Sequence, residues 1–213
     1  VNVVKNPLTV IQKPIRMLLK LVKKSIRRKN SHIYHISHIT YYNGKPYTGV
    51  FYRNYENGKL DYKINYKDGK KNGYEESYYE NGQLWEKILY KDGKENGLSL
   101  AYSETGELSV KGNYKDGKRD GLYEVYYKNG NLEVKRNYKD GIEGFFAIYY
   151  ENGQIQRTGN KKNGRADGLI KYYHSNGQLR TKVNYKDAKT EGYSESFYSN
   201  GQLWKKLNYK NDE

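Results

Sequence analysis

The chain has 213 residues, of which only 35% are hydrophobic, and its mean hydropathy of −1.12 is very polar. Disordered chains share this polarity but are poor in aromatic residues, whereas this chain has 26 Tyr, four Phe and two Trp. The absence of cysteine excludes disulfides and thiolate metal sites, and no stretch approaches the roughly 20 apolar residues that span a bilayer.

The net charge of +15 is unevenly distributed. Residues 1–40 carry nine Lys/Arg and no acidic residue, whereas residues 41–213 carry 30 basic and 24 acidic residues, a net +6. We therefore predict a basic leader and linker over residues 1–40 and a folded array over residues 41–213.

The leader has the period of an amphipathic helix. Pro14 suits a helix start, so we predict an N-terminal α-helix over about residues 15–29. One apolar stripe follows the helical spacing: Ile11, Ile15, Leu18, Leu19, Val22 and Ile26. Six basic residues fill most of the remaining surface and are our candidates for lipid or partner binding: Arg16, Lys20, Lys23, Lys24, Arg27 and Arg28.

Two interpretations of this helix stay open. It could lie on an anionic membrane surface, where each basic residue near the lipid contributes about 1 kcal/mol. It could equally cap the array by covering the first repeat with its apolar stripe. Nucleic acid is a less favoured ligand of the leader, since basic helices also neutralise phosphates. The array itself, with only +6 over 173 residues, is not expected to be a strong polyanion binder.

Three histidines follow the leader at a spacing of three, at His32, His35 and His38. Imidazoles at this spacing could bind zinc, yet no carboxylate or cysteine lies nearby in sequence to complete a ligand set. We interpret the segment as a polar linker and predict no metal site.

From residue 41 onward the chain repeats. One glycine of each unit recurs at steps of 24, 24, 24, 23, 24 and 24 residues: Gly49, Gly73, Gly97, Gly121, Gly144, Gly168 and Gly192. A fixed period of this size is typical of a repeat array in which each unit packs mainly on its neighbours. It argues against a catalytic pocket and favours an extended binding surface.

Each unit reads as a β-hairpin. In residues 73–94, two segments rich in aromatic and β-branched residues are separated by Asn81-Gly82 and closed by Asp92-Gly93, pairs that supply the positive φ angles of tight turns. Seven hairpins give about fourteen strands, and at ~4.8 Å per strand the sheet would be roughly 65–70 Å long. We predict a mostly β fold: an elongated antiparallel meander that twists or curls.

Alternation then predicts the two faces of the sheet. Tyr74 and Tyr78 of the first strand should share a packed face with Leu84 and Tyr90 of the second strand. The opposite face should carry a polar row of asparagines and six lysines, which are our repeat-surface binding candidates: Lys63, Lys87, Lys111, Lys135, Lys182 and Lys206. Such lysines could bind acidic partners, but solvated lysines also keep exposed sheets from pairing with one another.

The units resemble the MORN repeat (membrane occupation and recognition nexus), and more closely its bacterial variant, found in proteins named as the YwqK family of antitoxins. The resemblance is carried by the Y-Y-E-N-G-Q-L segment (Tyr78–Leu84) and the Y-K-D-G-K-x-x-G connector (Tyr66–Gly73, Tyr90–Gly97 and Tyr114–Gly121), and it covers roughly residues 41–213. It implies a β-hairpin array that makes protein or membrane contacts, and it supplies no catalytic residues.

We expect a non-enzymatic interaction or scaffold module without a cofactor. Acidic pairs such as Glu75 and Glu76 lie on repeat surfaces without a convergent pocket, so catalytic residues are not predicted. The expected partner is an unidentified protein; the antitoxin resemblance makes a toxin one candidate. The alternative is a peripheral protein whose main ligand is anionic lipid. Either role places the chain in the cytoplasm or at the inner face of the membrane.

Overall fold

Tight turns set the architecture. Asp68, Asp92 and Asp116 have φ angles of 50–51°, and the glycine after each has a φ of 77–85°. Two successive residues with positive φ form the hairpin turn whose twist matches that of the flanking strands. The last such turn contains Asp187 and Ala188, and Ala188 adopts the same conformation with a φ of 70°. The predicted Asp-Gly turns are therefore confirmed, and the turn at Asp187 and Ala188 keeps the same conformation without glycine.

The computed structural model describes residues 33–210, in which every regular element is a β-strand. The strands are β1 (Ile33–Ile36), β2 (Ile39–Tyr42), β3 (Lys45–Pro46), β4 (Gly49–Asn54), β5 (Leu60–Lys67), β6 (Lys70–Tyr78), β7 (Leu84–Lys91), β8 (Lys94–Tyr102), β9 (Leu108–Lys115), β10 (Lys118–Tyr126), β11 (Leu132–Lys139), β12 (Ile142–Tyr149), β13 (Ile155–Lys162), β14 (Arg165–Ala166), β15 (Gly168–Tyr173), β16 (Leu179–Lys186), β17 (Lys189–Phe197) and β18 (Leu203–Tyr209). The helix predicted over residues 15–29 lies outside the described residues.

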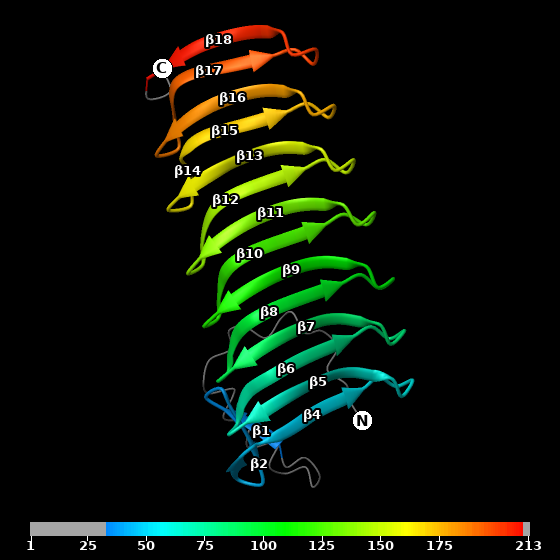
Figure 1. The fold of residues 1–213 in the computed structure, drawn as a ribbon. Helices are drawn as coiled ribbons and strands as arrows, with labels where there is room; N and C mark the ends of the chain where they lie inside the picture. Colours follow the sequence, from blue (N-terminus) through cyan, green and yellow to red (C-terminus); the bar gives the residue numbers. More distant parts are fainter. Residues whose placement is uncertain (1–32, 211–213) are drawn as a thin grey trace.

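The main sheet is a simple antiparallel meander. Strands β4 to β18 hydrogen-bond in sequence order, and the short β14 pairs with the end of β13. Figure 1 shows the hairpins stacked one after another into an elongated sheet, with the Asn-Gly ends along one long side and the Asp-Gly ends along the other. The mostly β, antiparallel prediction is thus confirmed.

A separate small sheet of β1, β2 and β3 lies beside the first Asp-Gly turn (Figure 1). The Thr40 amide donates to the Gly69 carbonyl at 2.7 Å, and the Gly69 amide donates to the Tyr47 carbonyl at 2.7 Å. A Cβ at Gly69 would meet the side chain of Ile39 at 2.4 Å. Glycine at this turn therefore serves two purposes, because it provides the positive φ and lets the small sheet approach.

Neighbouring hairpins are also tied together at their Asn-Gly ends. The Tyr79 hydroxyl donates to the Tyr102 carbonyl of the next hairpin at 2.8 Å, and the Asn81 amide donates to the Glu104 carbonyl at 2.8 Å. Equivalent pairs of bonds join most hairpins to the next one; their donors are Tyr55 and Asn57, Tyr127 and Asn129, Tyr150 and Asn152, and His174 and Asn176. In the third hairpin, Ser103 and Thr105 occupy these positions and bond Glu107 of their own hairpin instead. The bonds make each unit a support for the next.

The predicted distribution of side chains over the two faces is wrong in one respect. Tyr74 and Tyr78 lie on the same face as the lysine row, because Glu76 between them pairs directly with Lys87. A β-bulge causes the difference: Ser77 pairs with Glu86, but Tyr78 pairs with Leu84, so Trp85 falls out of the alternation. The first-strand aromatics therefore accompany the lysines instead of opposing them.

We call the two sides the lysine face and the tyrosine face. The lysine face carries the six predicted lysines; the tyrosine face carries the second-strand tyrosines Tyr66, Tyr90, Tyr114, Tyr138, Tyr185 and Tyr209. Most well-buried apolar residues belong to the tyrosine face, and Phe146, Ile170 and Val183 form a small cluster there. With a single layer of sheet, burial is concentrated in such local clusters.

Candidate functional site

The lysine face neutralises much of its own charge. Glu76 lies between Lys63 and Lys87, with Nζ–O distances of 2.5 and 2.8 Å, and it accepts a hydrogen bond from the Tyr78 hydroxyl. Glu124 lies between Lys111 and Lys135, and Glu195 lies between Lys182 and Lys206. All six predicted lysines therefore have a carboxylate partner within the sheet.

These contacts shift the pKa of Glu76 strongly. Burial alone would raise the pKa of this carboxyl, but hydrogen bonds from Lys63, Lys87 and Tyr78 outweigh burial and lower the pKa from 4.5 to about 2. The pKa of Glu195 is lowered as well, by the hydrogen bonds from its two lysines. Glu76 and Glu195 are therefore charged at neutral pH and paired with their lysines.

The tyrosine face is acidic toward its N-terminal end. Glu75, Glu86 and Glu95 surround Tyr90, and the neighbouring cation Lys71 forms an ion pair with Glu75. Burial raises the pKa of Glu86, and the charges of Glu75 and Glu95 raise it further. Burial and the same carboxylates raise the pKa of the Tyr90 hydroxyl. This end presents a negative surface with an aromatic centre.

Farther along the same face the sign of the charge reverses. The guanidinium of Arg119 stacks on Tyr123 at 4.1 Å and lies 5.4 Å from the ring of Tyr138. Gly112 makes room for this arrangement, because a Cβ there would meet the Tyr123 ring at 3.0 Å. Arginine and tyrosine thus begin a basic, aromatic region at β10 that continues into the next two hairpins.

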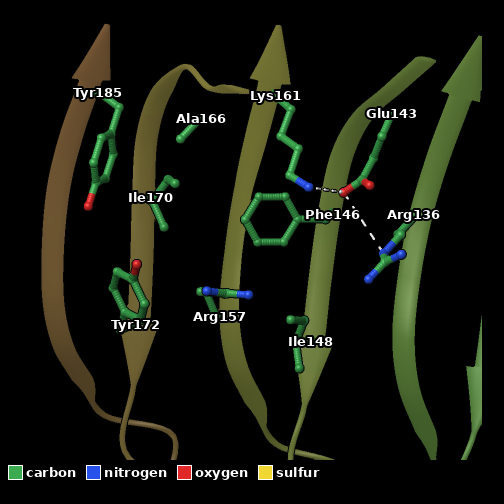
Figure 2. A pocket seen from close by; sticks show the side chains of 10 residues that line it. All are labelled: Arg136, Glu143, Phe146, Ile148, Arg157, Lys161, Ala166, Ile170, Tyr172 and Tyr185. Atoms are coloured by element: carbon green, nitrogen blue, oxygen red, sulfur yellow. Dashed lines mark ion pairs between the residues drawn. The ribbon is translucent and has the colours of Figure 1, made fainter. Parts of the chain in front are cut away.

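A hollow of about 340 Å³ lies in this basic region, between β11 and β16. Its lining side chains come from strands β11 to β16, and Figure 2 shows them together: Arg136, Glu143, Phe146, Ile148, Arg157, Lys161, Ala166, Ile170, Tyr172 and Tyr185. The volume falls at the lower end of the range of ligand pockets, and the combination of apolar side chains with a few charged groups is typical of them. We take this hollow as the candidate site.

Small residues shape the hollow. A Cβ at Gly159 would lie 2.8 Å from the Ile170 side chain and 3.0 Å from the Phe146 ring. Glycine at this position therefore allows both side chains to pack directly against the backbone of β13. Ala166 occupies the position held by Lys71, Glu95 and Arg119 in earlier units, and Lys161 replaces the tyrosine of the other units. The hollow therefore exists where three positions depart from the repeat pattern.

Three cations and one anion line the hollow. Glu143 forms an ion pair with Lys161 at 3.2 Å and lies 3.9 Å from Arg136. Arg157 has its guanidinium 5.3 Å from the Phe146 ring and 5.9 Å from the Tyr172 ring, and it forms no ion pair or hydrogen bond within residues 33–210. Three positive charges less one negative charge leave a net +2. The site is suited to an anionic ligand that also offers apolar surface.

None of the binding residues predicted from the sequence lines this hollow in the described part of the chain. The leader candidates Arg16 to Arg28 lie outside the described residues, and the lysine candidates lie on the opposite face from the hollow. Arg136, Arg157, Phe146 and Tyr172 were missed as functional residues. The signal that could have identified them is the local loss of the repeat pattern at Gly144 and Lys161.

Neither a metal-ligand cluster nor a membrane-spanning helix occurs in the described part of the chain. No group of three or more His, Cys, Asp or Glu residues within 33–210 is arranged to hold a metal ion. His35, one of the three spaced histidines, instead bonds the Thr40 hydroxyl at 2.8 Å. Over the same range no helix is long and apolar enough to cross a membrane.

Comparison with known proteins gives one clear result. The sequence pattern of the MORN repeat variant matches seven segments: residues 47–68, 71–92, 95–116, 119–140, 146–163, 166–187 and 190–211. The fifth segment is the shortest and contains most of the hollow's β12 and β13 residues.

The other comparisons add little. No curated protein matches the chain significantly. Among solved structures, it is similar to a protein of unknown function from Bacteroides fragilis, with 14% identity over 80% of this chain and 96% of that one, at a TM-score of 0.12. A TM-score of this size supports no conclusion about fold or function.

Proposed function

Because this chain belongs to the MORN repeat variant family, we propose that it is a non-enzymatic module that binds a protein partner across the tyrosine face of its sheet. A repeat array of this kind offers an extended surface on which many modest contacts add together. The proposal goes further than the family assignment by choosing a protein as the ligand and one face as the interface.

The observation that carries the proposal is the asymmetry between the two faces. On the lysine face, Lys63, Lys87 and their equivalents have carboxylate partners inside the sheet. On the tyrosine face, charged groups and aromatic rings line a hollow, and Arg157 has no ionic partner in the described chain. Aromatic residues and arginine are the residue types enriched where protein partners bind tightly.

Partner capture by the tagged full-length protein, in an extract of the source organism, tests the choice of face. Arg157→Glu and Glu86→Lys reverse charges in the basic and the acidic region of the tyrosine face. Lys171→Glu is the matched control, since Lys171 lies on the neighbouring strand β15 and on the lysine face. We expect at least one tyrosine-face variant to lose most of the partner and the control to retain it. Full recovery by both tyrosine-face variants would refute the proposal.

A second candidate function is attachment to an anionic membrane through the leader. It is favoured by the nine Lys/Arg and the absence of acidic residues in residues 1–40, which would also place the protein at the inner face of the membrane. Flotation with vesicles containing phosphatidylserine, using the full chain and a chain lacking residues 1–30, tests it. Equal flotation of the two chains would exclude this role for the leader.

An antitoxin role is the specialised form of the same protein-binding proposal. It requires a stable complex with a toxin encoded near this protein's gene. Co-expression of the neighbouring genes followed by purification should yield that complex, and neighbours that neither bind nor are toxic would count against it.

A further inference from the structure

We infer that the hollow between β11 and β16 binds an acidic segment of the partner protein, in which a carboxylate flanked by apolar side chains pairs with Arg157. This inference rests on the proposed function and specifies the partner's chemistry at one site. The described residues that carry it are Arg157, Phe146, Ile170 and Tyr172.

Arg157 is the anchor because its charge is half-buried and uncompensated. The other two cations of the hollow share Glu143, whereas the Arg157 guanidinium has no carboxylate partner within residues 33–210 and lies near the rings of Phe146 and Tyr172. Figure 2 shows its guanidinium lying between Tyr172 and Ile148, away from Glu143. A guanidinium held against aromatic rings is already oriented, so it loses little freedom when a carboxylate binds its planar edge.

The floor of the hollow favours an apolar neighbour for that carboxylate. Phe146 and Ile170, each only 5% exposed, form the base of the hollow, and the partly exposed Ile148 and Tyr172 beside them leave apolar surface open to it. A free inorganic anion could use Arg157 but would leave this surface in contact with water. A peptide that carries leucine or phenylalanine next to glutamate would cover both parts.

The charge pattern along the tyrosine face also limits the length of the acidic segment that can bind. Toward the N-terminal end, Glu86 and Glu95 would repel further carboxylates, and neither forms an ion pair within the described range. A long acidic run lying along the whole face would therefore be disfavoured. The complementary partner is acidic opposite β11 to β16 and neutral or basic opposite β6 to β8.

Fluorescence anisotropy with three short labelled peptides tests this inference on the full-length protein. In the first peptide Glu alternates with Leu; in the second Lys replaces Glu; in the third Ser replaces Leu. We expect saturable binding of the first peptide, and binding at least about tenfold weaker for each of the other two, because each lacks one of the two required contacts. Inorganic phosphate and phosphatidylserine vesicles serve as competing anions.

Variants then locate the site. Arg157→Gln should weaken binding of the Glu/Leu peptide by about tenfold or more, and Arg157→Lys should restore part of it, since lysine keeps the charge but lacks the planar fork. The matched control is Arg53→Gln: Arg53 lies on the same face and stacks on Tyr62 at 4.6 Å, but it is already paired with Asp61. Circular dichroism of each variant confirms that the sheet is intact.

Three results would overturn the inference: no peptide binding, equal binding of the Lys/Leu peptide, or an equal effect of Arg53→Gln and Arg157→Gln. Competition by phosphate or vesicles that removes all peptide binding would also overturn it, since the site would then recognise a simple anion or a lipid headgroup.

If partner capture depends on Glu86 and not on Arg157, the inference fails while the proposed function stands. If capture depends on neither residue, the proposed function fails as well.

Discussion

At the scale of single residues, Glu76 has the most sharply defined role. The residue is 8% exposed, and three donors hold the pKa of its carboxyl at about 2. Because the folded pKa lies below the ordinary 4.5, the stabilising contribution is present above pH 4.5 and is lost as the pH falls toward 2. We predict that Glu76→Gln lowers the free energy of unfolding at pH 7 by about 2–3 kcal/mol.

Denaturant titrations of both proteins at several pH values check this. The difference between wild type and variant should shrink between pH 4.5 and pH 2, and a difference independent of pH would contradict the assignment. Glu195→Gln is the control, because Glu195 pairs with two lysines but Phe197 stands where Tyr78 donates to Glu76. The control should cause a smaller loss.

At the scale of the element, the third hairpin has Thr105-Gly106 where the others have Asn-Gly, and its side chains at this turn do not bond the next hairpin within the described residues. Ser103 and Thr105 replace the tyrosine and asparagine that make these bonds elsewhere. We predict that Ser103→Tyr combined with Thr105→Asn stabilises the array by about 1–2 kcal/mol, since each new bond contributes roughly 1 kcal/mol. By analogy with the second hairpin, the acceptors would be the carbonyls of Tyr126 and Lys128.

Thermal and denaturant unfolding of the double variant measure the gain. The reciprocal control is Tyr79→Phe, which removes the bond to the Tyr102 carbonyl and should cost about 1 kcal/mol. If the control destabilises the protein while the double variant leaves it unchanged, the third hairpin differs from its neighbours by more than these two side chains.

Hairpins and turns could be predicted from the sequence because Asn-Gly and Asp-Gly act locally. The assignment of faces could not be completed, because the bulge that pairs Tyr78 with Leu84 depends on the register across the hairpin. The hollow was beyond prediction for a similar reason. Its space depends on contacts between Gly159, Phe146 and Ile170, which come from three different strands. In the sequence, the shortened connector before Gly144 and the lysine at Lys161 mark this region as irregular, but they do not predict a hollow.

At the scale of the whole molecule, the joint between the fifth and sixth hairpins is distinctive. Strand β13 pairs with β15 through Arg157↔Tyr172 and Thr158↔Lys171 and with the short β14 through Lys161↔Ala166 and Lys162↔Arg165, so the ladder is divided between two strands. The cluster of Phe146, Ile170 and Val183 spans this joint and adds side-chain packing to the divided ladder. We predict that Phe146→Ala costs about 3–5 kcal/mol locally and uncouples the last two hairpins from the rest.

Hydrogen exchange followed by mass spectrometry detects the uncoupling. In Phe146→Ala, β15 to β18 should exchange faster while β5 to β9 keep their protection. Phe145→Ala is the matched control: the adjacent Phe145 lies on the lysine face and is 41% exposed, so its removal should leave the pattern nearly unchanged. A uniform loss of protection along the sheet would instead indicate that the array unfolds as one unit.

The spacing of the glutamates has a consequence for how the chain avoids misfolding. Near-identical units invite a strand to pair with the wrong copy, and swapped assemblies are a characteristic failure of repeat proteins. Glu76, Glu124 and Glu195 occur in only some hairpins, whereas Leu100 and Ala147 hold the equivalent place in others. A strand that skips one unit puts Lys63 opposite Leu100 and takes one lysine away from the buried Glu76. The uneven spacing of these glutamates therefore favours pairing with the correct neighbouring strand among strands that are otherwise nearly identical.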